Sequence, residues 1–155
     1  MRQLITSFIF SRLDYCNTLL VNLLFSTIAP LQRVQNAAAH LLLGLRDHVR
    51  PALKELYWLP VMFRIKFKVA LMMFTVHTCR YLTDSVQACN SDPGRTLLRS
   101  ASSTNYSLPR TRTKFGDRAF SVAGPVVWNS LPAAVREADS LYWFKRKLKT
   151  HLFTM

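Results

Sequence analysis

The side chains best suited to chemistry with a partner are positively charged and lie in the second half of the chain. They form two groups along the sequence: Arg110, Arg112, Lys114 and Arg118, and then Lys145, Arg146, Lys147 and Lys149. Lysine and arginine donate charge-assisted hydrogen bonds to phosphate oxygens, and such contacts bind a backbone without reading its base sequence. The two groups therefore predict phosphate contacts to a polyanionic partner, with nucleic acid ahead of a membrane surface.

The overall charge points the same way. The 155 residues carry 21 Lys and Arg against eight Asp and Glu, a net charge of +13. Residues 1–60 hold six basic and three acidic side chains, net +3, whereas residues 61–155 hold fifteen and five, net +10. Such an excess attracts nucleic acid, although a basic surface without a specific partner stays open as an alternative.

Catalytic patterns are missing from the sequence. A polymerase needs two or three carboxylates that converge on paired Mg²⁺ ions, but none of the eight acids here is adjacent to another and there is no Tyr-x-Asp-Asp. No glycine-rich phosphate loop, G-x-S-x-G, H-E-x-x-H or Cys/His cluster occurs either. We therefore expect no catalysis by this chain alone, no catalytic residue, no metal, no cofactor and no small-molecule substrate.

The elements that position the charges are predicted to be helices. Apolar residues recur at spacings of three and four along residues 2–24, and apolar lines indicate further helices from Pro30 to a stop at Gly44 and at residues 139–153. Another helix is predicted at 60–79, a short helix at 51–57 and one more turn at 81–88. The fold class is therefore mostly α, a small helical bundle ending in a basic C-terminal helix capped by Asp139 or Ser140. The helix at 60–79 is apolar on most sides and should be central.

Several side chains of this bundle have two interpretations. Arg64 and Lys68, one turn apart, mark the exposed side of the central helix and are candidates for phosphate contact or simply solvated. Tyr57 and Trp58 are candidates for base stacking, whereas the structural alternative is that they fasten their turn to the core. The helix that follows Pro30 should bury these apolar residues: Leu31, Val34, Ala38, Leu41, Leu42 and Leu45.

We divide the chain into a helical bundle at residues 1–89, a basic polar loop or hairpin at 90–114, and a last part at 115–155. Ser, Thr, Asn, Arg, Pro and Gly dominate the middle part. A short β-hairpin around 96–113, with strands at 96–99 and 106–113, is the alternative to an irregular loop there.

The last part opens with the block FGDRAFSVAGPVVWNSLP at residues 115–132. Its aromatic residues Phe115, Phe120 and Trp128 are predicted to anchor the two basic groups on the bundle. Gly124 and Pro125 should interrupt the helix, with Pro125 as the first residue of a second one.

This block resembles one near the C-terminus of the reverse transcriptase polyproteins of non-LTR (LINE-type) retrotransposons. Further segments resemble the same family in the same order: residues 11–20 (SRLDYCNTLL), 31–39 (LQRVQNAAA), 56–61 (LYWLPV) and 140–149 (SLYWFKRKLK). The resemblance implies a thumb-like start at residues 1–25, then the post-thumb region, within an RNA-directed DNA polymerase. The catalytic palm of the family is not in this sequence.

The expected function is therefore sequence-independent binding of RNA or an RNA–DNA hybrid in support of reverse transcription by the missing polymerase domain. A non-catalytic structural or interaction module that docks on that polymerase core is the alternative, and a decayed transposable element with no selected function is another.

The expected location is intracellular, nuclear or cytoplasmic. The three cysteines, Cys16, Cys79 and Cys89, form no C-x-x-C pair and leave an odd one, which is typical of a reducing compartment. No apolar run approaches the roughly 18 residues that a membrane span needs, so no membrane partner is expected.

Overall fold

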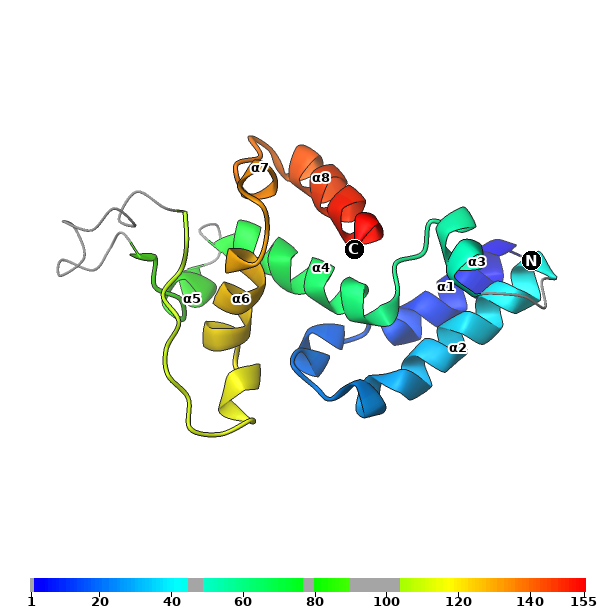
Figure 1. Ribbon diagram of the computed structural model, residues 1–155, viewed down its shortest axis with the longest axis horizontal. Helices are drawn as coiled ribbons and strands as arrows, with labels where there is room; N and C mark the ends of the chain where they lie inside the picture. The colour runs from blue at the N-terminus through cyan, green and yellow to red at the C-terminus, as the bar shows by residue number, and fades with distance from the viewer. Residues whose placement is uncertain (1, 45–48, 77–79, 90–103) are drawn as a thin grey trace.

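The computed structural model describes residues 2–44, 49–76, 80–89 and 104–155. The chain is mostly helical, as the apolar periodicity predicts (Figure 1). The helices are α1 (Arg2–Leu13), α2 (Phe25–Leu43), α3 (Val49–Glu55), α4 (Val61–Phe74), α5 (Arg80–Thr83), α6 (Phe120–Asn129), α7 (Ala133–Arg136) and α8 (Leu141–Thr154), with 3₁₀ turns η1 (Asn17–Leu20) and η6 (Gly116–Arg118). None of the helices in these ranges is long and apolar enough to cross a membrane.

Helix α4 is central, as expected. Figure 1 shows α1, α2 and α3 near its N-terminal end, α6 near its C-terminal end, and α8 along its side. Its buried side chains are Val61, Ile65, Val69, Ala70 and Met73. The last part of the predicted helix, residues 77–79, lies outside the described residues.

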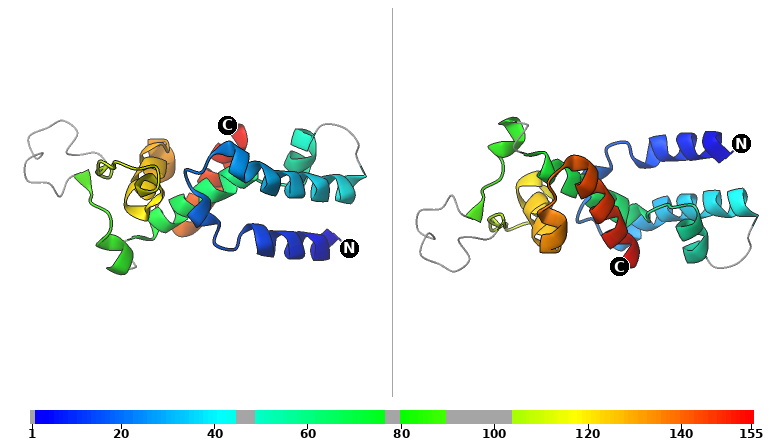
Figure 2. Two further views of the ribbon diagram at one scale, coloured as in Figure 1. Left: turned by 90° about the horizontal axis from the view of Figure 1, so that it is seen from below. Right: turned by 90° about the horizontal axis from the view of Figure 1, so that it is seen from above.

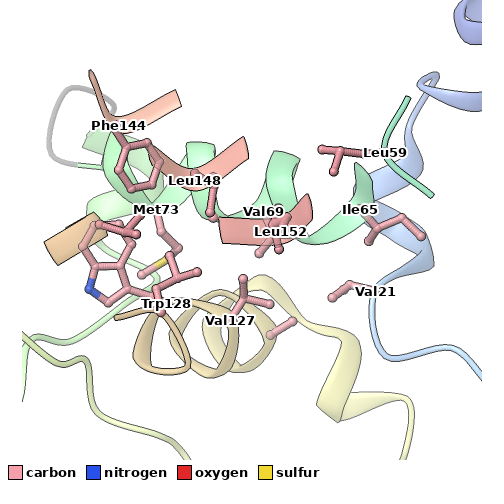
Figure 3. Close-up of a cluster of buried hydrophobic side chains, with 14 of the residues drawn as sticks. Val21, Leu59, Ile65, Val69, Met73, Val127, Trp128, Phe144, Leu148 and Leu152 are labelled. Carbon is pink, nitrogen blue, oxygen red and sulfur yellow. The ribbon is translucent and has the colours of Figure 1, made fainter. Parts of the chain in front are cut away.

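One core joins the early and late parts of the chain. Figure 3 shows Met73 of α4, Trp128 of α6 and Phe144 of α8 gathered at one end of this core. Val21, which follows η1, closes the other end. The described residues of 1–89 and those of 115–155 therefore share one core. A smaller cluster, in which Trp58 covers alanines of α2 and α3, holds these two helices together.

The first helix is shorter than predicted. Helix α1 ends at Leu13, and the chain passes through Cys16 (φ 49°) and Asn22 (φ 57°), both in the left-handed region that no continuous helix can contain. The break lets Asp14 form an ion pair with Arg64 and buries Asn17, whose Nδ2 donates to Asp14 Oδ1 at 3.3 Å. Tertiary contacts outweigh the helical apolar spacing here.

Helix α2 begins five residues before the predicted start at Pro30, and Gly44 (φ 64°) ends it as expected. The predicted apolar line is wrong at Val34 and Leu41, which are exposed. Instead Gln35 is fully buried, and its Nε2 donates to Leu59 O at 2.8 Å. Gln32 Oε1 accepts from Val61 N at 2.8 Å, which supplies a partner for the first turn of α4.

The predicted interruption at Gly124 and Pro125 is also wrong, because α6 continues through both residues. Pro125 costs the helix only the hydrogen bond to the Ser121 carbonyl, and its buried ring packs in the interior. Gly124 is needed for close approach, since a Cβ there would lie 2.6 Å from Met73 Sδ.

The three aromatic residues of the block differ in their roles. Trp128 is buried, and its Nε1 donates to Thr104 O at 2.9 Å. Phe120 is partly buried against the core. Phe115 is 80% exposed, so the prediction that it anchors the bundle is wrong. The chain turns into η6 beside it, and this turn directs the ring into solvent.

The predicted second strand at 106–113 is wrong. Residues 107–113 form no strand, and within the described ranges the pairing is an isolated antiparallel bridge between Ala88 and Tyr106. Ser107 N donates to Gln87 O at 2.7 Å and Cys89 N to Asn105 O at 3.0 Å. The side chain of Asn129 bonds to the backbone of Tyr106, since its Oδ1 accepts from Tyr106 N and its Nδ2 donates to Tyr106 O. The predicted first strand, 96–99, lies outside the described residues.

Candidate nucleic-acid interface

Helix α8 owes its orientation to a buried apolar line and an N-terminal cap. Ser140 Oγ accepts a hydrogen bond from Trp143 N at 3.4 Å, as its position before the helix predicts. Phe144, Leu148 and Leu152 are buried, and the Phe144 ring stacks on Phe74 with centroids 4.3 Å apart. The rest of the helix therefore faces outward in a defined orientation.

Four cations of α8 are exposed, and we call the three without a hydrogen bond to a neighbouring helix, Lys145, Arg146 and Lys149, the α8 basic face. The helix contains no acidic residue, and its last turn holds only His151 as a basic group. Favourable interaction with the C-terminal helix dipole therefore does not explain these three charges. Lys147 differs, because its Nζ donates to Ala134 O at 3.0 Å and so joins α8 to α7.

Aromatic rings lie among these cations. Tyr142 and Trp143 are exposed and meet edge to face, with centroids 5.5 Å apart. The Arg146 guanidinium carbon lies 5.4 Å from the centroid of Trp143. Cations beside exposed aromatic rings are the combination used to bind single-stranded nucleic acid. These two rings are not among the predicted site residues, although their position next to the Lys-Arg-Lys run is a signal that the sequence contains.

The first cationic group lies in irregular chain. Arg110, Arg112 and Lys114 are exposed in the stretch of residues 107–115, which we call the 107–115 segment. Thr111 Oγ1 is hydrogen-bonded to the Asp117 carboxylate, and Gly116 N donates to Thr113 Oγ1 at 3.0 Å. These local bonds shape the segment without burying it.

Arg118 has a different environment from the other predicted cations. It is half-buried, and its Nη2 donates to Leu19 O at 2.8 Å, while the neighbouring Asp117 O accepts from Asn22 Nδ2 at 2.8 Å. These two contacts join η6 to the chain around η1. Arg118 therefore has a structural role that its place in a basic run did not reveal.

The two cationic groups do not converge. In Figure 1 the 107–115 segment lies below α6, whereas α8 lies above α4. The views from below and from above in Figure 2 agree, because each brings one of the two to the front and places the other behind. A ligand that touches both groups has to pass around the molecule.

The structure gives different environments to three other candidates, Arg64, Tyr57 and Trp58. Arg64 pairs with Asp14, and its guanidinium carbon lies 4.0 Å from the Phe10 centroid, so this side chain is not free for phosphate. Trp58 is buried and meets Phe10 edge to face at 4.6 Å, which is the structural alternative. Tyr57 is 74% exposed and fastens nothing to the core.

In the described ranges, no three His, Cys, Asp or Glu side chains gather as a metal site. Burial raises the pKa of the Tyr106 phenol above its ordinary value. This ring packs edge to face on Trp128, with centroids 6.1 Å apart, so its environment is that of a core residue.

Comparison with protein-family models, curated proteins and solved structures found no match for this chain. The resemblance to LINE-type reverse transcriptase polyproteins therefore stays a prediction from sequence.

Proposed function

We propose that this chain binds nucleic acid independently of base sequence, through phosphate contacts from the α8 basic face. One observation carries the proposal: three exposed cations stand on a helix whose other side is fixed in the core by Phe144, Leu148 and Leu152. Fixed cations lose less side-chain and backbone entropy on binding than cations on a free chain.

RNA or an RNA–DNA hybrid is the nucleic acid we propose. The support for this choice is the resemblance to LINE-type reverse transcriptase polyproteins, in which this region follows the polymerase. In that role the chain is a non-catalytic fragment of an RNA-directed DNA polymerase polyprotein. It binds the template strand that the catalytic palm domain of the polyprotein copies. The 107–115 segment then adds weaker contacts to a strand that continues past α6.

The test is a salt titration of RNA binding by the purified chain. Fluorescence anisotropy with a short single-stranded RNA, repeated at increasing KCl, gives the slope of log K against log salt. Three phosphate contacts predict a slope of about −2, since each contact on a single strand contributes about −0.7. Undetectable binding, or binding that does not change with salt, would contradict the proposal.

Docking on another protein surface is a second candidate, favoured by exposed apolar side chains in the N-terminal helices. Leu4 and Phe8 lie one turn apart on α1, and Leu41 is exposed on α2. A partner that covers them would bury apolar area that otherwise faces water. Under this candidate, the Leu4→Gln and Phe8→Gln double variant abolishes association of the chain with that partner, measured by sedimentation. RNA binding, measured by anisotropy, stays unchanged.

A further inference from the structure

A pocket of about 220 Å³ opens where α4, α8 and the turn between α3 and α4 meet. Figure 1 shows the C-terminal end of α8 beside this turn. Leu59 and Phe67 supply its apolar wall, and the polar lining comes from Asp14, Arg64, Lys68, Lys149 and Tyr57. Four separate parts of the chain, namely Asp14 after α1, the turn at Tyr57, α4 and α8, thus bring polar groups to one small concave site.

The charge of this pocket favours an anion. Its lining holds three cations and one carboxylate, and the carboxylate of Asp14 is already paired with Arg64. Lys68 and Lys149 therefore contribute two positive charges that the pocket itself does not neutralise.

The tyrosine at the edge of the pocket is held in an unusual way. Tyr57 has φ 54°, a left-handed conformation that is rare for a bulky residue, and its ring is largely exposed. The turn is fixed on both sides, because Tyr57 N donates to Lys54 O at 3.0 Å and Trp58 N to Leu53 O at 2.8 Å. Buried Trp58 anchors the turn, so the Tyr57 ring is presented beside the cations without being needed in the core.

We propose that this pocket is a subsite for one nucleotide of a single strand: Lys68 and Lys149 contact its phosphate, and Tyr57 stacks on the adjacent base. The proposal rests on the proposed function and deepens it. Stacking requires an unpaired base face, which a duplex does not offer along its length. The subsite therefore makes the chain prefer single-stranded RNA to double-stranded RNA, whereas phosphate contacts alone bind both.

The stacking half is tested with Tyr57→Leu, which keeps apolar bulk but removes the aromatic face. The matched control is Tyr81→Leu, since Tyr81 is also largely exposed (84%, against 74% for Tyr57) and does not line the pocket. With a fluorescent single-stranded RNA, Tyr57→Leu should bind about fivefold more weakly or worse, which is the low end of the loss for one stacked base. Tyr57→Phe should bind as the unchanged chain does, and the affinity of all four proteins for an RNA duplex should be equal.

The phosphate half is tested with the Lys68→Ala and Lys149→Ala double variant against Lys66→Ala and Lys145→Ala. Both pairs remove one lysine from α4 and one from α8, but Lys66 and Lys145 do not line the pocket. Because Lys145 makes a phosphate contact in the proposed function, the control should lower the magnitude of the salt slope by about 0.7, and the pocket pair should lower it by about 1.4. Inorganic phosphate should compete with RNA for the unchanged chain more than for the pocket pair.

The outcomes separate the two claims. If the unchanged chain binds RNA with a steep salt dependence, but Tyr57→Leu matches Tyr81→Leu, the subsite is wrong and the proposed function stands. Equal loss of single-stranded and duplex binding in Tyr57→Leu also overturns the subsite. If the unchanged chain does not bind RNA at all, both fail. Thermal unfolding of each variant shows whether a loss of binding reflects a loss of folding.

Discussion

The α8 basic face and the 107–115 segment each carry three exposed cations, yet the fold holds them in different ways. Helix α8 is anchored by Phe144, Leu148 and Leu152, which are among the most buried side chains of the described residues. The 107–115 segment is shaped by a few hydrogen bonds around Thr111 and Thr113. The charge is therefore similar on the two surfaces, while the rigidity of the support is not.

This difference shows that a cation's role depends on what its neighbours bury. Arg118 follows the 107–115 segment in sequence and looks like its neighbours, but it donates to the Leu19 carbonyl and joins two parts of the fold. Lys147 lies within the basic run of α8, yet its Nζ donates a hydrogen bond to the Ala134 carbonyl. Counting charges along the sequence identifies the basic regions, and the packing then decides which cations stay available to a ligand.

The largest expected effect comes from removing the support of α8. Phe144→Ala leaves a cavity between Phe74 and Trp128 and should lower the free energy of unfolding by about 3–5 kcal/mol. The measurement is urea denaturation followed by tryptophan fluorescence. The Tyr142→Ala control, at an exposed ring of the same helix, should change it by less than about 0.5 kcal/mol. Equal effects of the two substitutions would contradict the packing described for α8.

A smaller effect is expected where α6 approaches α4. In Gly124→Ala, the new methyl group meets Met73 Sδ, and overpacking of this kind costs about 1–3 kcal/mol. Alanine regains about 1 kcal/mol of helix propensity, so the net loss of stability should be about 1 kcal/mol.

The same substitution should stabilise the protein when Met73 is first changed to alanine, because the clash is then gone and the propensity gain remains. The sign change between the two backgrounds is the diagnostic result in denaturation experiments. Destabilisation by a similar amount in both backgrounds would show that Gly124 is needed for another reason.

An effect of comparable size to that of Gly124→Ala distinguishes the cations near the 107–115 segment. Arg118→Ala should lower stability by about 1 kcal/mol, since it leaves the Leu19 carbonyl without its donor at a partly exposed site. Arg112→Ala should leave stability within about 0.5 kcal/mol. If the two variants unfold at the same denaturant concentration, Arg118 has no structural role of its own.

Parts of this fold follow from local sequence. The Ser140 cap, the line of Phe144, Leu148 and Leu152, and the mostly apolar stretch around α4 each carry their signal within a few residues. Gly44 ends α2 because glycine adopts the left-handed conformation without strain. The helical class, the central α4 and the basic last helix were therefore predictable.

The remaining features depend on partners that lie far away in sequence. Gln35 is buried because Leu59 offers it a carbonyl, and α1 stops because Asp14 meets Arg64. Pro125 stays inside α6, where core contacts outweigh one lost hydrogen bond. In the candidate site, the exposed cations of α8 were predictable from charge. The structural role of Arg118 and the placement of Lys68 and Lys149 around one pocket depend on the tertiary arrangement.

The most direct test of the central claim compares two charge reversals in RNA binding. One variant carries Lys145→Glu, Arg146→Glu and Lys149→Glu, and the other carries Arg110→Glu, Arg112→Glu and Lys114→Glu. Each makes three changes of two units and lowers the net charge from +13 to about +7, so non-specific attraction falls equally. We predict that reversal of the α8 basic face weakens single-stranded RNA binding about tenfold more than reversal in the 107–115 segment, since the fixed cations make the stronger contacts. Equal losses, a larger loss from the segment, or no loss in either variant would contradict the claim that α8 is the nucleic-acid interface.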